Sequence, residues 1–219
     1  MLERYLHALS LADPGEEDPA VTRERLRDRF PKGATRRMTQ LGLLIGAALD
    51  DLVPRYDDAV VYATQYGETR ALEGYLDSFP AASPTLFQTS IHPSAVQQAM
   101  ITRQQPVGEF FPMTGRGHLV AQAVQTSLLS PAPRVLLCGG EERGTWLLTR
   151  GVASDRTFAF AVALTAEPGG ALGRVALRPE DGTGGATEFS LPDFFEALKA
   201  RQALDRPVGP GARLILDWT

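Results

Sequence analysis

One stretch of this sequence, from Gly117 to Pro133, limits the possible folds more than any other. It contains no lysine, arginine, aspartate or glutamate, and His118 is the only residue in it that can gain a charge. Its apolar residues follow helical spacing on more than one face: Leu119, Val120, Ala121, Ala123, Val124, Leu128 and Leu129. A helix that is apolar on most sides is buried on most sides. The fold must therefore surround a helix from Gly117 to Leu129 with other elements.

Short strand patterns alternate with helical patterns through the middle of the chain. Compact apolar and aromatic runs indicate strands at Val60 to Ala63, Glu109 to Met113 and Val135 to Cys138. The helical patterns between and around them cover Met38 to Leu52, Leu72 to Phe79, Pro93 to Arg103 and Gly117 to Leu129. This alternation predicts an α/β fold in which three parallel strands form a largely buried sheet with helices on its faces.

The carboxyl-terminal part has a different pattern. Strands are indicated at Thr157 to Thr165 and Arg174 to Leu177, and a helix from Leu191 to Ala203 precedes a last strand at Arg213 to Asp217. We expect these strands to be antiparallel additions, which makes the whole a layered mixed sheet. The glycine-rich stretch Asp181 to Gly185 predicts a turn, because it lacks the lysine and hydroxyl residue of a phosphate-binding loop.

The first 35 residues are charged and interrupted by prolines. Leu2 to Leu11 predicts a short helix, Val21 to Phe30 is rich in arginine and glutamate, and no strand pattern is evident. We therefore divide the chain into a charged amino-terminal helical segment (residues 1–35), a main domain (36–165) and a β/α extension packed on the same domain (166–219).

Charge and cysteine content exclude several classes of protein. The chain has 22 basic and 26 acidic residues, a formal net charge of -4, and only two lysines, Lys32 and Lys199. A nucleic-acid-binding surface is not expected from this balance. A single cysteine, Cys138, excludes an internal disulfide, and the three scattered histidines predict neither a metal nor a cofactor. With no apolar run as long as a membrane span and no secretion signal at the start, we expect a cytoplasmic protein.

Four short motifs occur in order between residues 36 and 142. They are Arg36-Arg37-Met38 at the start of a helix, Tyr62 to Glu68 (YATQYGE), Ser83 to His92 (SPTLFQTSIH) and Val135 to Glu142 (VLLCGGEE). Together they resemble the amino-terminal half of β-ketoacyl synthases, most closely the ketosynthase-like proteins encoded with bacterial aryl-polyene and xanthomonadin-type pigment pathways. The third motif is the most specific, because these families carry a Ser-Pro-x-x-Phe-x-x-Ser-Val-His-Asn string. Here Ile91 and Pro93 replace the valine and the asparagine.

The resemblance implies a thiolase-like half fold for residues 36–165, and it also implies that the family's chemistry is missing. A condensing ketosynthase uses a cysteine at a strand-to-helix turn and two histidines from the carboxyl half of its fold. Thr114 lies where that cysteine is expected, no histidine follows His118, and the opening strand of the family is not evident. We therefore expect a non-catalytic accessory or interaction subunit of a bacterial polyketide or fatty-acid-like pigment pathway, comparable to a chain-length factor.

Two other functions stay open. A small acyl-transfer or thioester-hydrolysing enzyme would use Thr114 as nucleophile, with His118 one helical turn further on as its base. Alternatively, the remaining cleft would bind an acyl chain or an aromatic acid without turnover.

Other chemically reactive side chains have structural interpretations. Cys138 lies within an apolar run, which predicts a buried, unreactive thiol. Ser90 and His92 are expected to fix a loop through hydrogen bonds from their side chains to the backbone. Glu141 and Glu142 follow a strand and predict a solvated turn rather than an acid/base pair.

The resemblance also implies association with another chain. In ketosynthase-like dimers the strand that corresponds to Glu109 to Met113 pairs with its two-fold mate, and the helix after it packs between two sheets, one from each half. We therefore expect a homodimer or a heterodimer with a ketosynthase, with an acyl carrier protein as a further partner. The interface candidates are Glu109, Phe110, Phe111, Met113, Val120 and Val124.

Overall fold

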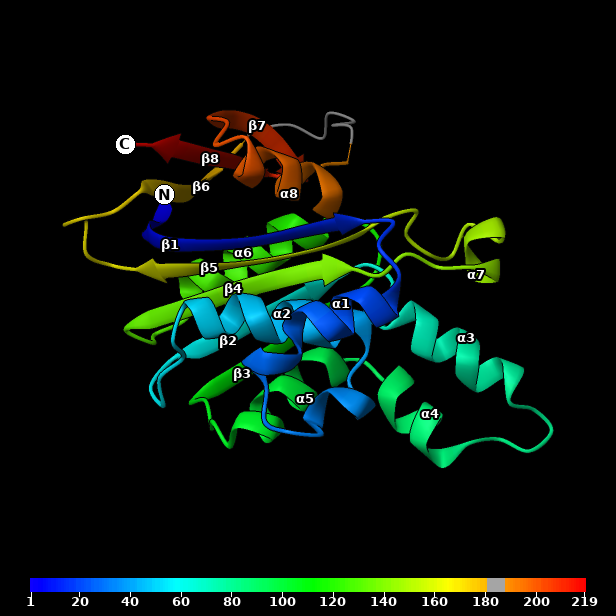
Figure 1. Cartoon of the computed structure of the whole chain (residues 1–219). Helices are drawn as coiled ribbons and strands as arrows, with labels where there is room; N and C mark the ends of the chain where they lie inside the picture. Colours follow the sequence, from blue (N-terminus) through cyan, green and yellow to red (C-terminus); the bar gives the residue numbers. More distant parts are fainter. Residues whose placement is uncertain (181–187) are drawn as a thin grey trace.

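The computed structural model describes residues 1–180 and 188–219, which build one eight-stranded mixed sheet (Figure 1). The strands lie in the order β3-β2-β4-β5-β1-β6-β8-β7. Their bounds are β1 Leu2–Gly15, β2 Ala59–Thr64, β3 Glu109–Thr114, β4 Arg134–Glu141, β5 Thr157–Thr165, β6 Gly173–Pro179, β7 Leu204–Gly209 and β8 Ala212–Trp218. The stretch Asp181 to Gly185, predicted as a turn, lies outside the described residues.

Helices connect these strands and cover both faces of the sheet. Their bounds are α1 Pro19–Leu26, α2 Gln40–Asp51, α3 Thr69–Asp77, α4 Pro84–Ser90, α5 Ser94–Arg103, α6 Leu119–Leu129, α7 Trp146–Thr149 and α8 Leu191–Lys199, with short 3-10 turns η1 Arg27–Arg29 and η2 Ala34–Arg37. None of the helices in residues 1–180 and 188–219 combines the length and the apolar character that crossing a bilayer requires.

The parallel part of the sheet consists of the three strands that the sequence predicts. Strand β2 pairs in parallel with β3, with Val60 opposite Phe110, and with β4, with Val61 opposite Leu137. Strand β5 then runs antiparallel to β4 along its whole length. The predictions of a layered α/β fold, of three parallel strands and of antiparallel strands from Thr157 onward are confirmed.

The amino-terminal segment differs from the prediction, because Leu2 to Leu11 is not a helix. It belongs to β1, which pairs antiparallel with β5 on one side and with β6 on the other. Its leucines, alanines, glutamate and arginine favour a helix locally, but two neighbouring strands and burial of Leu6 outweigh that preference. The opening strand that the sequence pattern does not reveal is therefore present, and all three sequence segments contribute strands to one sheet.

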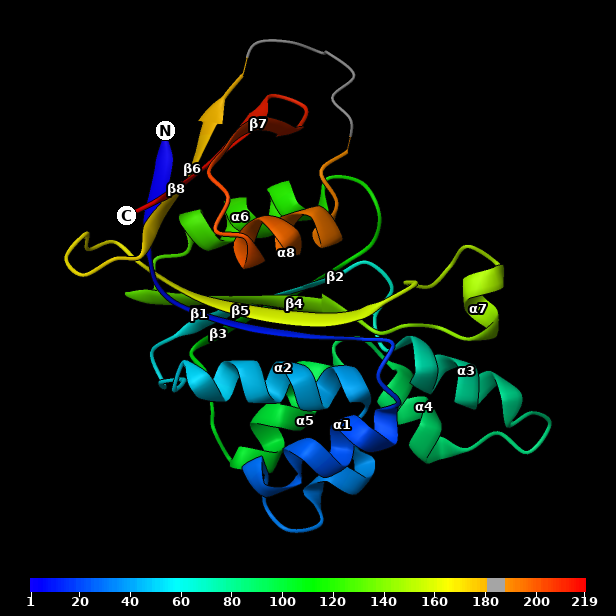
Figure 2. The same ribbon diagram turned by 45° about the horizontal axis from the view of Figure 1, so that its top comes forward.

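Alternate residues of the central strands point to opposite faces of the sheet. On β2, Val60 and Tyr62 join the apolar core under α2 and α5, whereas Val61 and Ala63 join the core under α6 and α8. Both cores are needed because both faces of a parallel sheet are usually buried. Figure 2 shows the two layers, with α2 and α5 on one side and α6 and α8 on the other.

The carboxyl-terminal strands rise over helix α6, so the chain covers this helix by itself (Figure 2). Val120 and Val124 are 1% and 0% exposed and share a core with Phe194 of α8 and Val208 of β7. The prediction that Val120 and Val124 meet a second chain is therefore wrong. The physical reason is that residues 166–219 supply a helix and three strands, and these bury the apolar face that the other half of a longer fold would cover.

Candidate functional site

The loops that follow β2, β3 and β4 lie where a parallel sheet usually carries its site. Thr114, the last residue of β3, is exposed, and His118 precedes α6 in the left-handed region with φ 58°. The His118 ring lies against Gly209, where an added Cβ would be 3.2 Å from Nδ1. In the described part of the chain, no hydrogen bond joins Thr114 to His118. The structure thus brings both residues to one loop without the hydrogen bond that would activate a threonine.

Arg116 fixes the loop that carries Thr114, although the sequence analysis did not single it out. Its guanidinium lies 5.2 Å from the ring centroid of Tyr66 and donates to the Tyr66 hydroxyl at 3.3 Å. It also donates to the carbonyl oxygen of Gly151, beyond β4. One side chain therefore links the loops after β2, β3 and β4.

Cys138 lies in the middle of β4, inside the sheet rather than at its edge. The side chain is fully buried, and this burial raises the pKa of the Cys138 thiol above its ordinary value. A thiol in such surroundings stays protonated and is a poor nucleophile. The prediction of a buried, structural cysteine is confirmed.

Glu141 ends β4, and the prediction of a solvated turn there is wrong because the side chain is buried. Its carboxyl group accepts hydrogen bonds from the backbone N–H groups of Gln65 and Tyr66 and from the hydroxyl of Thr64, the last two at 3.2 Å. Burial nevertheless raises the pKa of Glu141 to about 8, more than these donors lower it. Glu141 therefore holds the turn after β2.

Glu142, the next residue, is also buried and points to the helices rather than to the solvent. One carboxyl oxygen accepts from the backbone N–H of Gln40 at 3.1 Å and from that of Leu41 at 3.4 Å, in the first turn of α2. The other oxygen accepts from the backbone N–H of Arg70, in the first turn of α3, at 3.0 Å. Burial raises the pKa of Glu142. A single side chain thus caps two helices that are far apart in sequence.

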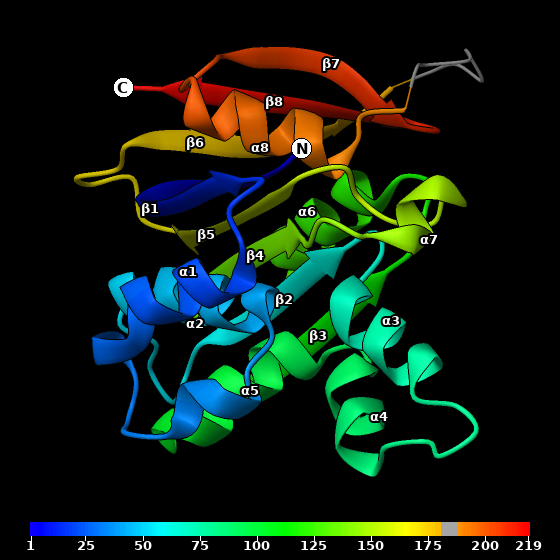
Figure 3. The ribbon, with the colours of Figure 1, turned by 45° about the vertical axis from the view of Figure 1, so that its right-hand side comes forward.

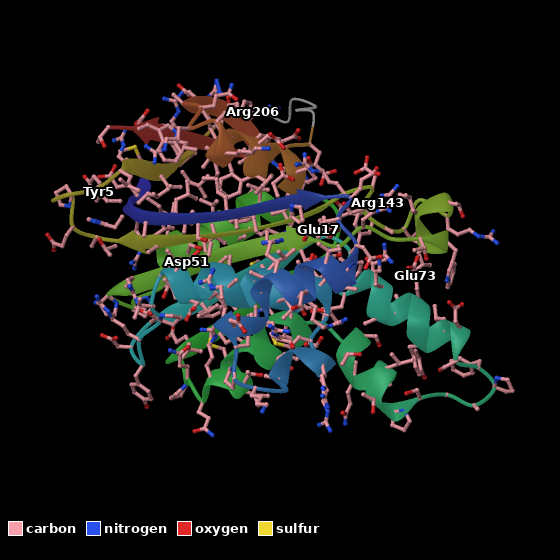
Figure 4. All side chains as sticks on the ribbon, in the orientation of Figure 1. Tyr5, Glu17, Asp51, Glu73, Arg143 and Arg206 are labelled. Atoms are coloured by element: carbon pink, nitrogen blue, oxygen red, sulfur yellow. The ribbon has the colours of Figure 1, made fainter. Side chains whose placement is uncertain are left out.

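Two further buried glutamates do the same for other helices. Glu68 accepts from the backbone N–H of Ala95, at the start of α5, at 2.7 Å. Burial raises the pKa of Glu68 to about 7. Glu73, a residue of α3 (Figure 4), accepts from the backbone N–H groups of Thr145 and Leu147, at the start of α7, at 2.7 and 2.9 Å. The carboxyl groups of Glu68 and Glu73 therefore hold the starts of α5 and α7.

Ser90 and His92 have different roles from each other. The hydroxyl of Ser90 donates to the carbonyl oxygen of Phe87 at 2.8 Å, which is a side-chain to backbone bond as predicted, but both residues belong to α4, so the bond lies at a helix end and not in a loop. The His92 ring instead stacks on Tyr62, with 5.2 Å between ring centroids, and makes no hydrogen bond within the described residues. Burial lowers the pKa of His92 to about 4, which keeps the ring neutral at physiological pH.

The described residues bring no three histidine, cysteine, aspartate or glutamate side chains together in a geometry that would hold a metal ion. The buried carboxyl groups accept hydrogen bonds from separate helix ends and from the turn after β2.

Among the residues that the structure describes, strand β3 forms one edge of the sheet and pairs with β2 alone. Phe110 packs against the core under α2 and α5, whereas Phe111 and Met113 pack against the opposite core, and all three stay partly exposed. Glu109 is exposed at the start of the strand. Four of the interface candidates therefore lie on an edge strand, and within residues 1–180 and 188–219 no strand pairs with its outer side; their role in an interface stays a prediction.

This architecture defines the class of fold: the chain has a thiolase-like fold, in which a mixed sheet with a parallel centre is covered by helices on both faces. No protein-family model matches the sequence, and no curated protein matches it.

Solved structures of the ketosynthase type share the fold. A chain in the complex of the ketosynthase ApeO with its chain length factor ApeC from Xenorhabdus doucetiae is similar over 99% of this chain and 100% of its own length, with a TM-score of 0.70 and 18% identity. The ishigamide ketosynthase/chain length factor matches 83% of this chain and 68% of its own, with a TM-score of 0.56 and 14% identity. The type II polyketide synthase complex AntDE:AntF, of a ketosynthase with its acyl-carrier protein, matches 82% and 70%, with a TM-score of 0.54 and 10% identity.

Proposed function

We propose that this protein is a non-catalytic, ketosynthase-like accessory subunit that pairs with a complete ketosynthase in a bacterial polyketide or fatty-acid-like pathway. The pathway is proposed to be of the aryl-polyene pigment type, from the sequence motifs and from the likeness to a chain of the ApeO–ApeC complex. Thr114 in place of a nucleophilic cysteine, and burial of the only cysteine, support a role without condensation chemistry.

The observation that carries this proposal is the outer side of β3, with which no strand pairs in the described ranges 1–180 and 188–219. An edge strand presents unpaired N–H and C=O groups, to which another strand can add. Both edge strands carry a proline, Pro112 in β3 and Pro207 in β7, as expected because prolines within sheets are confined to edge strands. The other edge, β7, carries the charged residues Asp205 and Arg206, which discourage pairing. Of the two edges, β3 is therefore the one suited to a partner.

Co-expression with a complete ketosynthase from the same genome tests the proposal. The two chains should co-purify as a heterodimer, with the mass measured by light scattering after size exclusion. Thr114→Lys, on the exposed face of β3, should weaken the complex, whereas Asp205→Lys, on β7, is the matched control and should not. A wild-type chain that fails to bind the ketosynthase would contradict the proposed function. An acyl carrier protein is a second proposed partner, and its binding is measured with the same preparations.

A further inference from the structure

A long uncharged segment lies between two charged parts of the chain. From Ser78 to Thr102 there is no aspartate, glutamate, lysine or arginine, although 22% of the residues of the whole chain are charged. The segment contains the α3–α4 loop, all of α4 and nearly all of α5. Solvent-exposed surface is usually rich in charged residues, and their depletion is typical of the centre of a protein–protein interface.

This segment also exposes large apolar side chains. Phe79 is 55% exposed, Phe87 47% and Ile91 45%. The two phenylalanine rings both lie 5.3 Å from the ring of Tyr75 on α3, so their positions are fixed by mutual packing. Figure 3 shows α3 and α4 projecting from the body of the protein as a helical pair beside the carboxyl end of β3. We call these two helices, their connecting loop and Ile91, residues 69–91, the arm.

The arm is held firmly at its base, although it projects. Glu68, just before α3, caps α5, and Glu73 in α3 caps α7, as described above. Trp146 of α7 also donates from its indole nitrogen to a carboxyl oxygen of Asp77 at 3.4 Å. An apolar surface that is fixed in place before binding loses little conformational entropy when a partner covers it.

A positively charged margin borders the uncharged surface. Lys32, Arg36 and Arg37 line a groove of about 910 Å³ whose other wall is formed by α4 and α5, including Gln88 and Gln98. Within residues 1–180 and 188–219, none of these three cations forms an ion pair. Cations without an acidic neighbour attract acidic groups of a second molecule and speed its approach.

We propose that the exposed apolar residues of the arm, with this positively charged margin, form a docking surface for the ketosynthase partner. The partner surface should have an uncharged apolar centre over Phe79, Phe87 and Ile91 and acidic residues over Arg36 and Arg37. This inference rests on the proposed function and extends the contact beyond β3. A bilayer fits less well, because the chain is net negative and the uncharged segment carries polar glutamine, serine and threonine among its exposed residues.

The experiment measures the dissociation constant of the complex between the complete ketosynthase and variants of this chain. Phe87→Asp and Ile91→Asp should each raise it about thirtyfold, the effect typical of losing a buried anchor residue. Val21→Asp is the matched control, because Val21 is 54% exposed on α1, outside the arm, and its replacement should change nothing. Ile91→Asp serves as the second variant because Ile91 takes no part in the ring cluster. Arg36→Glu with Arg37→Glu should slow association and reduce its dependence on salt.

Each other outcome rejects a specific statement. If the wild type binds and Thr114→Lys weakens binding, but both arm variants bind as tightly as Val21→Asp, the arm inference is wrong and the proposed function stands. If the wild type does not bind, the proposed function itself is wrong. A homodimer of this chain that Phe87→Asp dissociates would make a second copy the occupant. If the chain sediments with phosphatidylglycerol vesicles and Phe87→Asp abolishes this binding, the occupant of the surface is a membrane. Either of these last results contradicts the inference.

Discussion

Replacing Glu142 with alanine tests whether the buried carboxyl groups organise this fold. The side chain accepts three backbone N–H groups, at 3.1, 3.4 and 3.0 Å, from the first turns of α2 and α3. Alanine leaves these donors without an acceptor in a place that water does not reach. Both helix ends should loosen together, because one side chain serves both.

The size of the effect follows from the two shorter hydrogen bonds. A buried donor left unpaired costs about 1–3 kcal/mol, so two of them cost about 2–6 kcal/mol. Removing the carboxyl group also removes the unfavourable desolvation of that group, which offsets part of the loss. We therefore expect Glu142→Ala to lower the free energy of unfolding by about 2–4 kcal/mol, a large share of the roughly 5–15 kcal/mol typical of a folded protein.

Urea unfolding followed by far-UV circular dichroism measures this loss. With a slope of about 1–3 kcal/mol per molar urea, the midpoint should fall by roughly 1 M or more. Glu24→Ala is the matched control, because Glu24 is exposed and pairs only with Arg27 at 2.8 Å, a kind of contact worth about 0–1 kcal/mol. If Glu142→Ala lowered the midpoint no more than Glu24→Ala does, the capping role assigned to Glu142 would be refuted.

Three further predictions concern the dependence of stability on pH, the apolar core around α6 and the absence of reaction with thioesters. Because the pKa of Glu141 is raised from 4.5 to about 8 in the folded protein, the unfolded chain loses this proton first, and the contribution of Glu141 to stability should fall as pH rises from 4.5 to 8. Between pH 7.5 and 8.5, a full unit above the ordinary pKa of 6.5 of His92, the unfolding free energy of Glu141→Gln should depend less on pH than that of the wild type. Val124→Asp should unfold the chain rather than dissociate a dimer, since it buries an unpaired charge; circular dichroism that stays native would disprove this. Incubation with malonyl or acyl thioesters should leave the intact mass unchanged, and a stoichiometric adduct on Thr114 or Cys138 would overturn the non-catalytic proposal.

The parts of the fold that the sequence predicts correctly are those whose pattern is local. The β-branched run at Val60 to Ala63 and the long apolar run at Thr157 to Thr165 mark strands without reference to any neighbour. Leu2 to Leu11 has no such pattern, because its strand conformation depends on pairing with β5 and β6. Strand β7 was missed as well, since Asp205, Arg206 and Pro207 are unfavourable in strands except at an edge.

Predictions for the candidate site are likewise correct only where they depend on residues close together in the sequence. Thr114 and His118 were assigned to one loop from their spacing, and the structure places them there. Glu141 was misread because a glutamate after a strand is usually solvated, and its buried acceptor role depends on Gln65 and Tyr66, which lie in another loop. Val124 is buried by residues 166–219. The sequence of α6 itself does not determine which segment packs over the helix, so this contact was not predicted.

The central position of β1 has a consequence for how the chain folds during synthesis. Leu2 is paired with Leu177, and Tyr5 with Thr165, so the first strand leaves the ribosome long before its neighbours exist. Until then its leucines, including the fully buried Leu6, have no sheet to enter, and closing so long a loop is slow. Assembly of the sheet is therefore expected late and as a unit, and a chain stalled before residue 157 should expose an unpaired strand and become a substrate for chaperones or proteases.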